Sequence, residues 1–340
     1  MGRKNGKPER LQRILKAMRH DIYQSFMNLM LLIVTTIYRE LSDIRKGVIG
    51  NFRWFFMRKM ARFNTCQYLA KFFRGNTDTS AKDFRQATIS NSIFEDIDIN
   101  HIINQLKQDG IYVGLNLPKD IVNEIRAFAY DTPCYANGCE HLGFYYHEKE
   151  RVLKENQINL IIGDYYNTSH CDAIQKISND PVLTEISRHY FNNDITCQGH
   201  KLWWSFPTEI SIYHQFKYGQ TFHYDIDDYA ALKFFFYMTD VRTTSGPHVC
   251  VLGSHHSKKI LHKVFRGYWS DDTIIRNYKK ENIKTIYSRS GEGFVEDIFC
   301  LHKGLIPENE DRLILVIEYA IRDYGMQNNL KSNNQLKLIT

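Results

Sequence analysis

The pattern that most restricts the fold is a change of hydrophobic period in the C-terminal half of the chain. From Glu209 onward, several short segments alternate apolar and polar residues or are apolar throughout, with Gly or Pro between them. The predicted strands are EISIYHQFKY, ALKFFFYM, PHVCVLGSHH, GEGFVEDIFCLH and RLILVIEYAI. Because no regular helices separate them, these strands indicate an antiparallel barrel or sandwich and not a parallel βαβ sheet.

Helical patterns precede these strands. Residues Ile99–Val113 predict a helix that ends near Gly110 and leads into a strand. Residues Leu115–Tyr130 predict the end of a strand and a second helix that is entered through Pro118. The stretch 135–200 is mixed in composition and gives no clear signal. We therefore expect a mainly β fold with flanking helices, of the α+β class.

The N-terminal part of the chain carries the positive charge. Residues 1–75 contain 16 Lys or Arg and 4 Asp or Glu, whereas the whole chain has a net charge of +6. Residues 9–46 predict one long helix, because apolar residues recur at three- and four-residue steps. The next segment, Asn51–Phe63, interleaves Trp and Phe with Arg and Lys, which is typical of a helix at a lipid headgroup surface. Nucleic acid is a less favoured partner, because the apolar face of the long helix is continuous.

The sequence leaves the partner of this arm open between a membrane surface, a second subunit and the chain's own main domain. The apolar centre of the long helix, Ser25–Tyr38, is shorter than the roughly 20 residues that cross a membrane. No small-residue cleavage site of a signal peptide follows it. The seven cysteines are an odd number without regular spacing, which indicates reduced thiols in a cytoplasmic protein. We expect a cytoplasmic location, with membrane association through the arm as the open alternative.

Composition also suggests where the domains divide. The segment Gly75–Asp83 has the polar composition of a linker. We expect a basic, amphipathic helical arm over residues 1–80, a main domain over residues 81–325 and a disordered tail over residues 326–340.

A metal site is predicted around the stretch FHYD, residues 222–225. A mononuclear Fe(II) oxygenase uses two imidazoles and one carboxylate and keeps the opposite positions open. His223 and Asp225 point the same way on an extended segment, because they are two residues apart. His302, at the end of the predicted strand GFVEDIFCLH, is the natural third ligand. Arg312, ten residues further on, can form a bidentate pair with the distal carboxylate of 2-oxoglutarate.

Each of these residues also has a simpler explanation. His223 and Asp225 could be a polar pair at the edge of a strand, and His302 could be a surface or capping histidine. Arg312 could pair with a nearby glutamate. Lys233 is either part of a pocket wall that meets an anionic substrate or co-substrate, or a solvent-exposed lysine at a strand end. The combination within one β-rich region is more specific than any of its parts.

Four stretches together carry a family resemblance. They are the opening LKQDGIYVGLNLPKDIVNEI, the FHYD triplet, the stretch MTDVRTTSGPHVCVLGSHH and the segment from His302 to Arg312. Through them, residues 99–322 resemble the phytanoyl-CoA dioxygenase family of Fe(II)/2-oxoglutarate-dependent oxygenases. By this resemblance His223, Asp225 and His302 bind iron, and Arg312 holds 2-oxoglutarate.

The resemblance implies a double-stranded β-helix, which is a jelly-roll or cupin-like barrel. It also implies Fe(II) as the metal, 2-oxoglutarate and O2 as co-substrates, and succinate and CO2 as products. Tyr213 and Gln215 match strand positions where relatives place co-substrate contacts. Halogenating relatives carry a small residue in place of Asp225, so its presence favours hydroxylation or another oxygenase outcome. Gly304 departs from the family pattern, since many relatives have Ser or another polar residue there.

The expected function is hydroxylation of a small-molecule, lipid-linked or glycan-type substrate by an Fe(II)- and 2-oxoglutarate-dependent dioxygenase. The basic, aromatic arm motivates the lipid-linked alternative. Two other classes remain: a non-catalytic cupin-like protein that binds a metal or ligand, and a non-redox barrel enzyme such as a sugar epimerase. The complete ligand set and Arg312 favour the oxygenase. The substrate is set by loops and helices, chiefly within residues 130–205, where the sequence has no readable motif.

Overall fold

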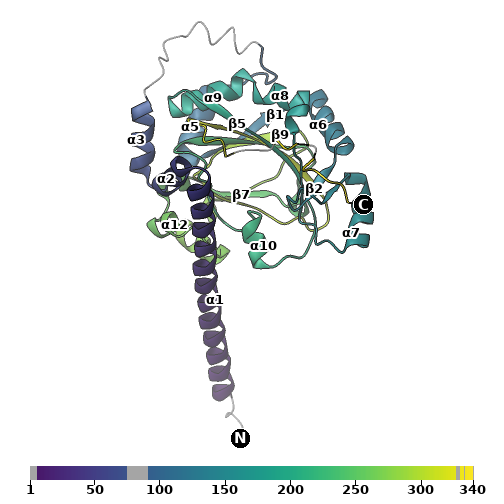
Figure 1. The fold of residues 1–340 in the computed structure, drawn as a ribbon. Coiled ribbons are helices and arrows are strands. Elements are labelled where there is room, and N and C mark those ends of the chain that lie inside the picture. The colour runs from purple at the N-terminus through teal and green to yellow at the C-terminus, as the bar shows by residue number, and fades with distance from the viewer. Residues whose placement is uncertain (1–5, 75–90, 327–329, 333, 340) are drawn as a thin grey trace.

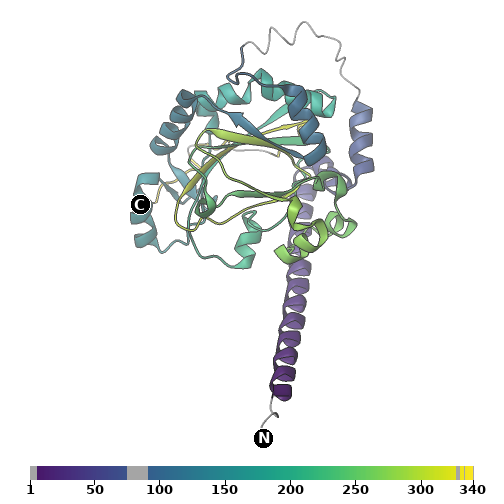
Figure 2. The ribbon, with the colours of Figure 1, turned by 180° about the vertical axis from the view of Figure 1, so that it is seen from behind.

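The computed structural model describes residues 6–74, 91–326, 330–332 and 334–339. A long helix, α1 (Gly6–Ile49), projects from a body in which helices surround β-sheets (Figure 1). From the opposite side, the sheets lie at the centre of the body with helices around them (Figure 2). The predicted linker Gly75–Asp83 lies outside the described residues.

The remaining elements alternate between short helices and strands. The helices are α2 (Phe52–Met60), α3 (Asn64–Arg74), α5 (Ile99–Asp109), α6 (Lys119–Asp131), α7 (Lys149–Asn156), α8 (Asp172–Ser178), α9 (Pro181–Phe191), α10 (Ile212–Lys217), α11 (Ser254–Ser257), α12 (Ile260–Val264) and α13 (Asp271–Tyr278). The strands are β1 (Ile111–Asn116), β2 (Cys134–Ala136), β3 (Gly143–Phe144), β4 (Ile162–Asp164), β5 (Thr196–Ser205), β6 (Ala231–Tyr237), β7 (His248–Val251), β8 (Ile283–Ile286), β9 (Glu292–Asp297), β10 (Leu301–Gly304) and β11 (Arg312–Ala320). Short 3₁₀ turns lie at η1 (Tyr146–Glu148), η2 (Thr168–His170), η3 (Thr243–Ser245) and η4 (Lys280–Asn282).

The strands form two sheets. The large sheet has the order β1-β9-β6-β11-β5-β4-β2-β3, and the small sheet has the order β10-β7-β8. Every pair of these strands is antiparallel. The fold is therefore mixed helix and sheet with antiparallel sheets, as the strand pattern predicts, and not a parallel βαβ fold.

Alternation along β6 shows how the two faces of the large sheet are used. Phe234 and Phe236 belong to the main core, which the helices α5, α6, α8 and α9 cover on one side of the sheet (Figure 1). Phe235 and Tyr237 point the other way, into a second cluster that includes Ile286 of the small sheet. The second face of the large sheet therefore packs against the small sheet, and the candidate site lies between them.

The helix α2 is part of the body. Its N-terminus is capped by the Asn51 side chain, which accepts a hydrogen bond from the Trp54 backbone N–H at 3.0 Å. Trp54 and Met57 are buried in a cluster with Phe222, whereas Phe56 on the opposite side is 52% exposed. The aromatic and basic segment that suggested a lipid surface thus uses its tryptophan to pack on the chain's own domain.

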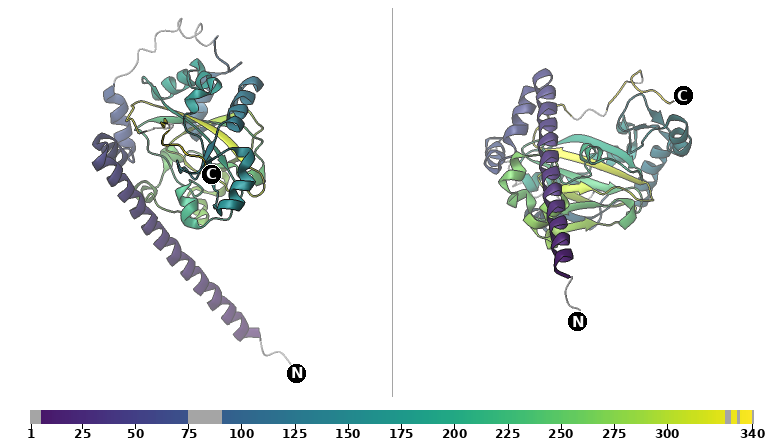
Figure 3. Two further views of the ribbon diagram at one scale, coloured as in Figure 1. Left: turned by 45° about the vertical axis from the view of Figure 1, so that its right-hand side comes forward. Right: turned by 90° about the horizontal axis from the view of Figure 1, so that it is seen from below.

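The helix α1 confirms the long helix predicted over residues 9–46, and much of it extends away from the body (Figure 3). In the described side chains it exposes a long row of large apolar groups: Ile22, Tyr23, Phe26, Met27, Leu29, Met30, Ile33, Val34, Ile37, Tyr38, Leu41 and Ile44. Within the described ranges, no helix has the length and apolar character that crossing a membrane requires.

The C-terminal part of α1 is fixed to the body. A Cβ atom at Gly267 would lie 2.3 Å from the Leu32 carbonyl oxygen, so glycine allows the loop to approach the helix closely. The next residue, Tyr268, donates its backbone N–H to Thr35 Oγ1 at 2.7 Å. Ion pairs join α1 to α2 and to the turn after it: Glu40 with Lys59 and with Arg62 of that turn, and Asp43 with Arg58 and Lys59.

The segment EISIYHQFKY is not a strand, contrary to the sequence prediction. Residues Ile212–Lys217 form α10, whose first turn is capped by Ser211 through a hydrogen bond accepted from the His214 backbone N–H. A capping serine followed by a short run without Gly or Pro satisfies the first turn of a helix, and this local effect outweighed the apparent alternation.

The segment GEGFVEDIFCLH forms two strands in two different sheets, whereas the sequence predicted a single strand. The chain turns after Asp297, whose side chain accepts a hydrogen bond from the Phe299 backbone N–H at 2.8 Å. The Cys300 backbone N–H donates to the Asp297 carbonyl at 2.8 Å and closes the turn. His302 therefore lies within β10 of the small sheet rather than at the end of a longer strand.

The predicted disorder of residues 326–340 does not apply to the described part of this segment. The Gly143 backbone N–H donates to Lys337 O at 2.9 Å, and the Ile339 N–H donates to Gly143 O at 2.8 Å. The tail therefore lies along the outer strand β3, where it satisfies backbone groups at the sheet edge.

Candidate active site

His223 and Asp225 lie on an extended segment beside β10. The backbone N–H of His223 donates to His302 O at 2.9 Å, and the N–H of His302 donates to His223 O at 2.8 Å. Phe222 and Tyr224, which alternate with them, point into a hydrophobic cluster. The polar side chains are consequently turned to the opposite side, and the pairing brings His302 next to them.

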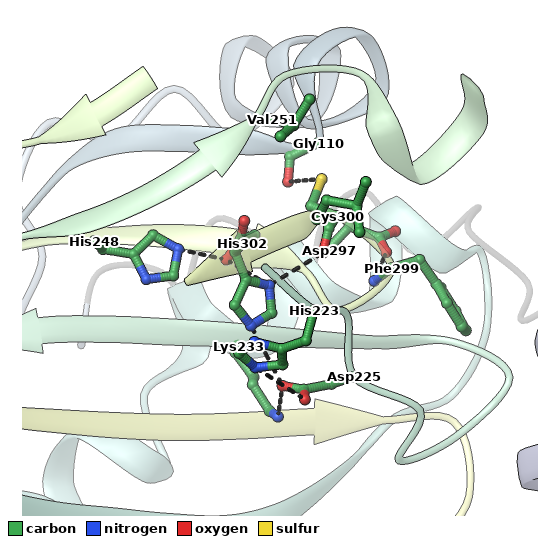
Figure 4. A network of polar contacts seen from close by, with 12 residues as sticks. Gly110, His223, Asp225, Lys233, His248, Val251, Asp297, Phe299, Cys300 and His302 are labelled. Carbon is green, nitrogen blue, oxygen red and sulfur yellow. Dashed lines mark hydrogen bonds and ion pairs between the residues drawn. The ribbon is translucent and has the colours of Figure 1, made fainter. Parts of the chain in front are cut away.

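The three predicted metal ligands meet in one place. One ligand atom from each of His223, Asp225 and His302 can be chosen so that all three lie within 4.8 Å of one another. His223 Nε2 lies 3.8 Å from Asp225 Oδ1, and His302 Nε2 lies 3.7 Å from Asp225 Oδ2. Figure 4 shows the two imidazoles and the carboxylate gathered at one point. Two imidazoles and one carboxylate are the donor set of a non-heme Fe(II) centre.

Both histidines are oriented for metal binding. Nδ1 of His223 lies 2.8 Å from the Thr221 carbonyl oxygen, and Nδ1 of His302 lies 3.1 Å from the Cys300 carbonyl oxygen. With a proton on Nδ1 that is donated to these carbonyls, the Nε2 lone pair is free for a metal. Burial lowers the pKa of both imidazoles, that of His223 well below its usual range, so both are neutral at neutral pH. The neutral form is the form that binds metals.

Lys233 binds Asp225, the carboxylate among the three candidate metal ligands. Its Nζ lies 2.6 Å from Asp225 Oδ2 and 2.8 Å from Asp227 Oδ2 (Figure 4 shows the contact with Asp225). Burial alone would raise the pKa of Asp225, but the Lys233 ammonium outweighs it and holds this pKa well below its usual range. The lysine was predicted to bind co-substrate. It does line the cavity, but its ammonium group is engaged by the two carboxylates.

His248 and Glu296 belong to the same polar group and were missed in the sequence. His248 Nε2 lies 2.9 Å from Glu296 Oε2, and the same oxygen lies 3.6 Å from His302 Nδ1. Burial raises the pKa of Glu296 to about 8 and lowers that of His248 to about 3. The sequence signal that could have identified Glu296 is a charged residue inside an apolar strand. In the structure Glu296 on β9 lies directly opposite Lys233 on β6.

Arg312 faces the same cavity, which has a volume of about 200 Å³ and is lined by the three metal-ligand candidates. Its side chain is buried, and Nη2 donates to Ser205 Oγ at 3.0 Å. Among the described residues, Nε has no hydrogen-bond partner and the guanidinium has no ion-pair partner. A Cβ atom on Gly304 would lie 3.5 Å from Nη2, in ordinary contact. A buried guanidinium with an unused donor is suited to a carboxylate ligand.

Tyr213 and Gln215 are not brought to the cavity. Both lie on α10, and neither lines the space around the metal-ligand candidates. Tyr213 is 43% exposed and its ring lies 5.8 Å from that of Tyr38 on α1. Gln215 donates its side-chain N–H to Ile210 O at 3.3 Å. The prediction that they contact co-substrate depended on a strand that does not form.

Comparison with known proteins gives similar structures and no sequence relatives. No family model matches the chain, and no curated protein matches it in sequence. SnoN, a non-heme alpha ketoglutarate dependent epimerase from nogalamycin biosynthesis, is 13% identical with a TM-score of 0.47, over 67% of this chain and 87% of its own. HygX from Streptomyces hygroscopicus, solved with nickel and 2-oxoglutarate, is 12% identical with a TM-score of 0.44, over 65% and 86%.

A third similar structure is EvdO2 from Micromonospora carbonacea var. aurantiaca, solved in complex with 2-oxoglutarate. It is 14% identical with a TM-score of 0.45, over 67% of this chain and 92% of its own. These identities and TM-scores are low, so the function of this chain rests on the chemistry of its own residues.

Proposed function

We propose that the protein is an Fe(II)- and 2-oxoglutarate-dependent oxygenase built on a double-stranded β-helix. The observation that carries the proposal is the meeting of two neutral imidazoles, one ionised carboxylate and a buried arginine in one cavity. A structural polar cluster would not require an arginine with an unused donor at this place. The co-substrate is the one that HygX and EvdO2 hold in their structures, although the proposal rests on the residues of this chain.

Each residue has a defined role in this proposal. His223 and His302 would hold the metal through Nε2, and Asp225 would hold it through the oxygen that Lys233 leaves free. Arg312 and the Ser205 hydroxyl receive the distal carboxylate of 2-oxoglutarate. The iron and 2-oxoglutarate that these residues would hold would supply, with O2 as the oxidant, the chemistry that converts a substrate C–H bond to C–OH; one oxygen atom of O2 enters the product and the other enters succinate, and CO2 is released.

The chain's other groups prepare the cavity for this chemistry. Lys233 keeps Asp225 ionised and fixes its rotation, which preserves one ligand oxygen for the metal. Phe235 and Phe294 stack with ring centroids 4.7 Å apart behind the ligands and present an apolar surface on the side of His248. Such a wall excludes water from the interior end of the cavity.

Hydroxylation is the proposed outcome. Asp225 occupies the ligand position that a halide would need, so halogenation is disfavoured. We also propose that the chain belongs to the phytanoyl-CoA dioxygenase-like group within this class, on the motifs between residues 99 and 322. A cytoplasmic location is proposed from the cysteines, which are all free thiols.

The oxygenase proposal is tested by adding Fe(II) and 2-oxoglutarate without oxygen and recording the weak visible charge-transfer band of the complex. Wild type should show the band, His223→Ala should lose it, and Arg312→Ala should require much more 2-oxoglutarate. His256→Ala, an exposed histidine outside the cavity, is the matched control and should behave as wild type.

Two results would count against the proposal. If wild type binds neither Fe(II) nor 2-oxoglutarate, the oxygenase assignment fails and a non-redox barrel enzyme takes its place. If the band forms but oxygen releases no succinate with any substrate or alone, a metal- and ligand-binding protein without turnover is favoured.

We propose in addition that the exposed apolar row of α1 is covered in the working protein, by a lipid surface or by a second copy of the chain. Single exposed apolar side chains are common on protein surfaces, but a row of twelve large ones is typical of a surface that binds a partner.

A further inference from the structure

A second, strongly basic cavity adjoins the candidate metal site. It has a volume of about 390 Å³ and is lined by residues of α1, α2, β5, α10 and the loop before α13. Its charged lining consists of six basic residues and three acidic ones: Arg39, Lys46, Arg58, Lys201, Lys217 and Arg266, with Asp43, Asp225 and Asp227. Asp225 and Lys201 line both cavities, so the basic cavity opens directly beside a candidate metal ligand.

We infer that this basic cavity binds a phosphate or pyrophosphate group of the substrate that is oxidised at the neighbouring metal site. The inference rests on the proposed oxygenase function in one respect: the molecule that carries the phosphate is taken to be the substrate of that enzyme. The anion site itself depends only on the charges and contacts of the cavity.

Each acidic residue of the cavity already has a basic partner within the protein. Asp43 Oδ1 accepts from Arg58 Nε at 2.9 Å, and Asp225 and Asp227 share Lys233. Asp43 Oδ2 also lies 3.5 Å from Arg266 Nη1. The carboxylates that line the cavity are therefore engaged by Arg58, Lys233 and Arg266.

Four of the basic residues have no such partner. Arg39, Lys46, Lys201 and Lys217 form no ion pair with any carboxylate in the part of the chain that the structure describes. The Arg39 guanidinium stacks over the Phe216 ring, 4.4 Å from its centroid, which fixes its plane at the cavity wall. Burial lowers the pKa of Arg39 to about 10, and the nearby Asp225 carboxylate acts in the opposite direction. Arg39 thus lies within electrostatic range of the metal-ligand candidates and remains cationic at neutral pH.

Arg266 provides the buried, unsatisfied donors of the site. Its side chain is only 3% exposed, and Nε and Nη1 have no hydrogen-bond partner among the described residues. The nearest carboxylate oxygen, Asp43 Oδ2, lies 3.5 Å from Nη1 and already belongs to a residue paired with Arg58. A buried guanidinium with unused donors is unfavourable unless an anion accepts from it.

The surplus of charge identifies the class of anion. Six basic and three acidic side chains line the cavity, an excess of three positive charges before Lys233 is counted, although Lys46, Lys201 and Lys217 are exposed. This excess favours a phosphate or pyrophosphate over a single carboxylate. Arginine also presents paired N–H donors in the geometry that phosphate oxygens accept. The cavity is therefore suited to a phosphorylated substrate whose reacting carbon extends towards the metal.

The arm of the protein forms one wall of this site. Arg39, Asp43 and Lys46 lie three or four residues apart and share one face of α1. That face is fixed to the body by the close approach at Gly267 and by the ion pair of Asp43 with Arg58. A segment that would otherwise be an appendage thus contributes directly to substrate recognition.

The test measures binding of inorganic pyrophosphate to the full-length, metal-free protein by titration calorimetry at low ionic strength. Wild type should bind it, and Arg39→Gln and Arg266→Gln should each weaken binding by about tenfold or more, since a charge-assisted hydrogen bond is lost. Arg45→Gln is the matched control: it removes the same charge from the same helix at an exposed position outside the cavity. Arg39→Lys keeps the charge and should restore much of the binding, and circular dichroism of every variant separates lost binding from lost fold.

A further variant locates the anion. Binding should survive Arg312→Ala, because that arginine belongs to the co-substrate end of the first cavity. Loss in Arg312→Ala with retention in Arg39→Gln would overturn the inference, as would equal weakening in Arg45→Gln or no binding to wild type. Because no metal is present, these outcomes are independent of whether the oxygenase proposal holds.

The source of the phosphate is decided with vesicles. If a lipid headgroup supplies it, wild type should float with phosphatidylcholine vesicles that contain phosphatidic acid, and Arg39→Gln should float less than Arg45→Gln. If pyrophosphate binds and the two variants float alike or not at all, a soluble phosphorylated compound is the ligand. Either result supports the anion site, provided that wild type binds pyrophosphate; flotation without pyrophosphate binding overturns it.

Discussion

Lys233 lies in a row of charged residues that crosses three neighbouring strands. The strand register pairs it with Glu318 on β11 and with Glu296 on β9. Its ammonium turns to Asp225 and Asp227 instead of pairing with one strand neighbour alone. The carboxylate of the candidate metal site is therefore kept ionised without a metal, and under the proposed function this removes a proton-release step from metal loading.

The candidate metal ligands could be predicted from single residues and their spacing. The residues that contact these ligands could not. His223 and Asp225 follow from the two-residue period, and His302 from its place after a strand. Glu296 and His248 reach the site only through the pairing of distant strands, which single-residue patterns do not contain. Their signal in the sequence was weak: a charged or polar residue inside a segment that otherwise reads as buried strand.

Lys258 gives a prediction about pH. Its Nζ is buried, donates to the Phe299 carbonyl and lies 3.7 Å from the centroid of the Tyr224 ring. Burial lowers its pKa to about 7 from 10.5. Between these two values the unfolded chain holds the proton that the folded protein has lost, so the free energy of unfolding should rise with pH.

The measurement compares wild type with Lys258→Met by urea unfolding at pH 7.5 and 9.5. The wild-type free energy of unfolding should rise relative to the variant by about 1 kcal/mol per pH unit. Below pH 7 both states hold the proton, and the difference should become constant. Lys259→Met, at an exposed neighbouring position, should follow wild type, and a parallel course for Lys258→Met would refute the assignment.

The length of an element decides whether its secondary structure could be predicted from the sequence. The helices α1, α5 and α6 and the strands β6 and β11 were predictable because their hydrophobic period continues over many residues. The helix α10 is only six residues long. Over that length, the capping serine determines the secondary structure more strongly than the hydrophobic period does. Residues 135–200 fold mostly into short elements that are joined by turns, where little period can develop; the exception is α9, which is 11 residues long like α5 and was missed.

The packing of α2 on the body gives a prediction about stability. Trp54 is 6% exposed and packs in the cluster behind the FHYD segment. Trp54→Ala should lower the free energy of unfolding by about 3–5 kcal/mol, because a large buried side chain is lost and a cavity remains. Denaturant unfolding of the full-length chain measures this difference.

Phe56→Ala is the control for that measurement. It removes an aromatic ring from the same helix, but from a position that is 52% exposed. Its effect should stay within about 0.5 kcal/mol. If both variants lose the same stability, or neither does, α2 is not packed on the body as described.

For the whole molecule, the apolar row on α1 is a surface that calls for a partner, since it holds twelve exposed large apolar side chains. Wild type should either sediment as a dimer or larger species, above its mass of 40.2 kDa, or float with vesicles. The double variant Ile33→Glu/Ile37→Glu places two charges in the row and should give a monomer that does not float.

Gln24→Glu adds a charge to an exposed position of the same helix and should retain the wild-type behaviour. Sedimentation and flotation together separate the two partners, since only self-association raises the mass without lipid. A wild-type monomer that ignores vesicles would contradict the proposal that this surface is covered.

The close approach at Gly267 has a consequence for how such a protein could change its substrate. The candidate metal ligands lie on β10 and on the segment beside it, whereas one wall of the basic cavity comes from a helix that precedes them all in the chain. Under the two proposals, oxidation and recognition are carried by separate lengths of polypeptide, which meet where Gly267 lets a loop approach α1 and where Asp43 pairs with Arg58. We expect that exchange of that helix for another would redirect the proposed oxidising centre to a different molecule without altering one of its ligands.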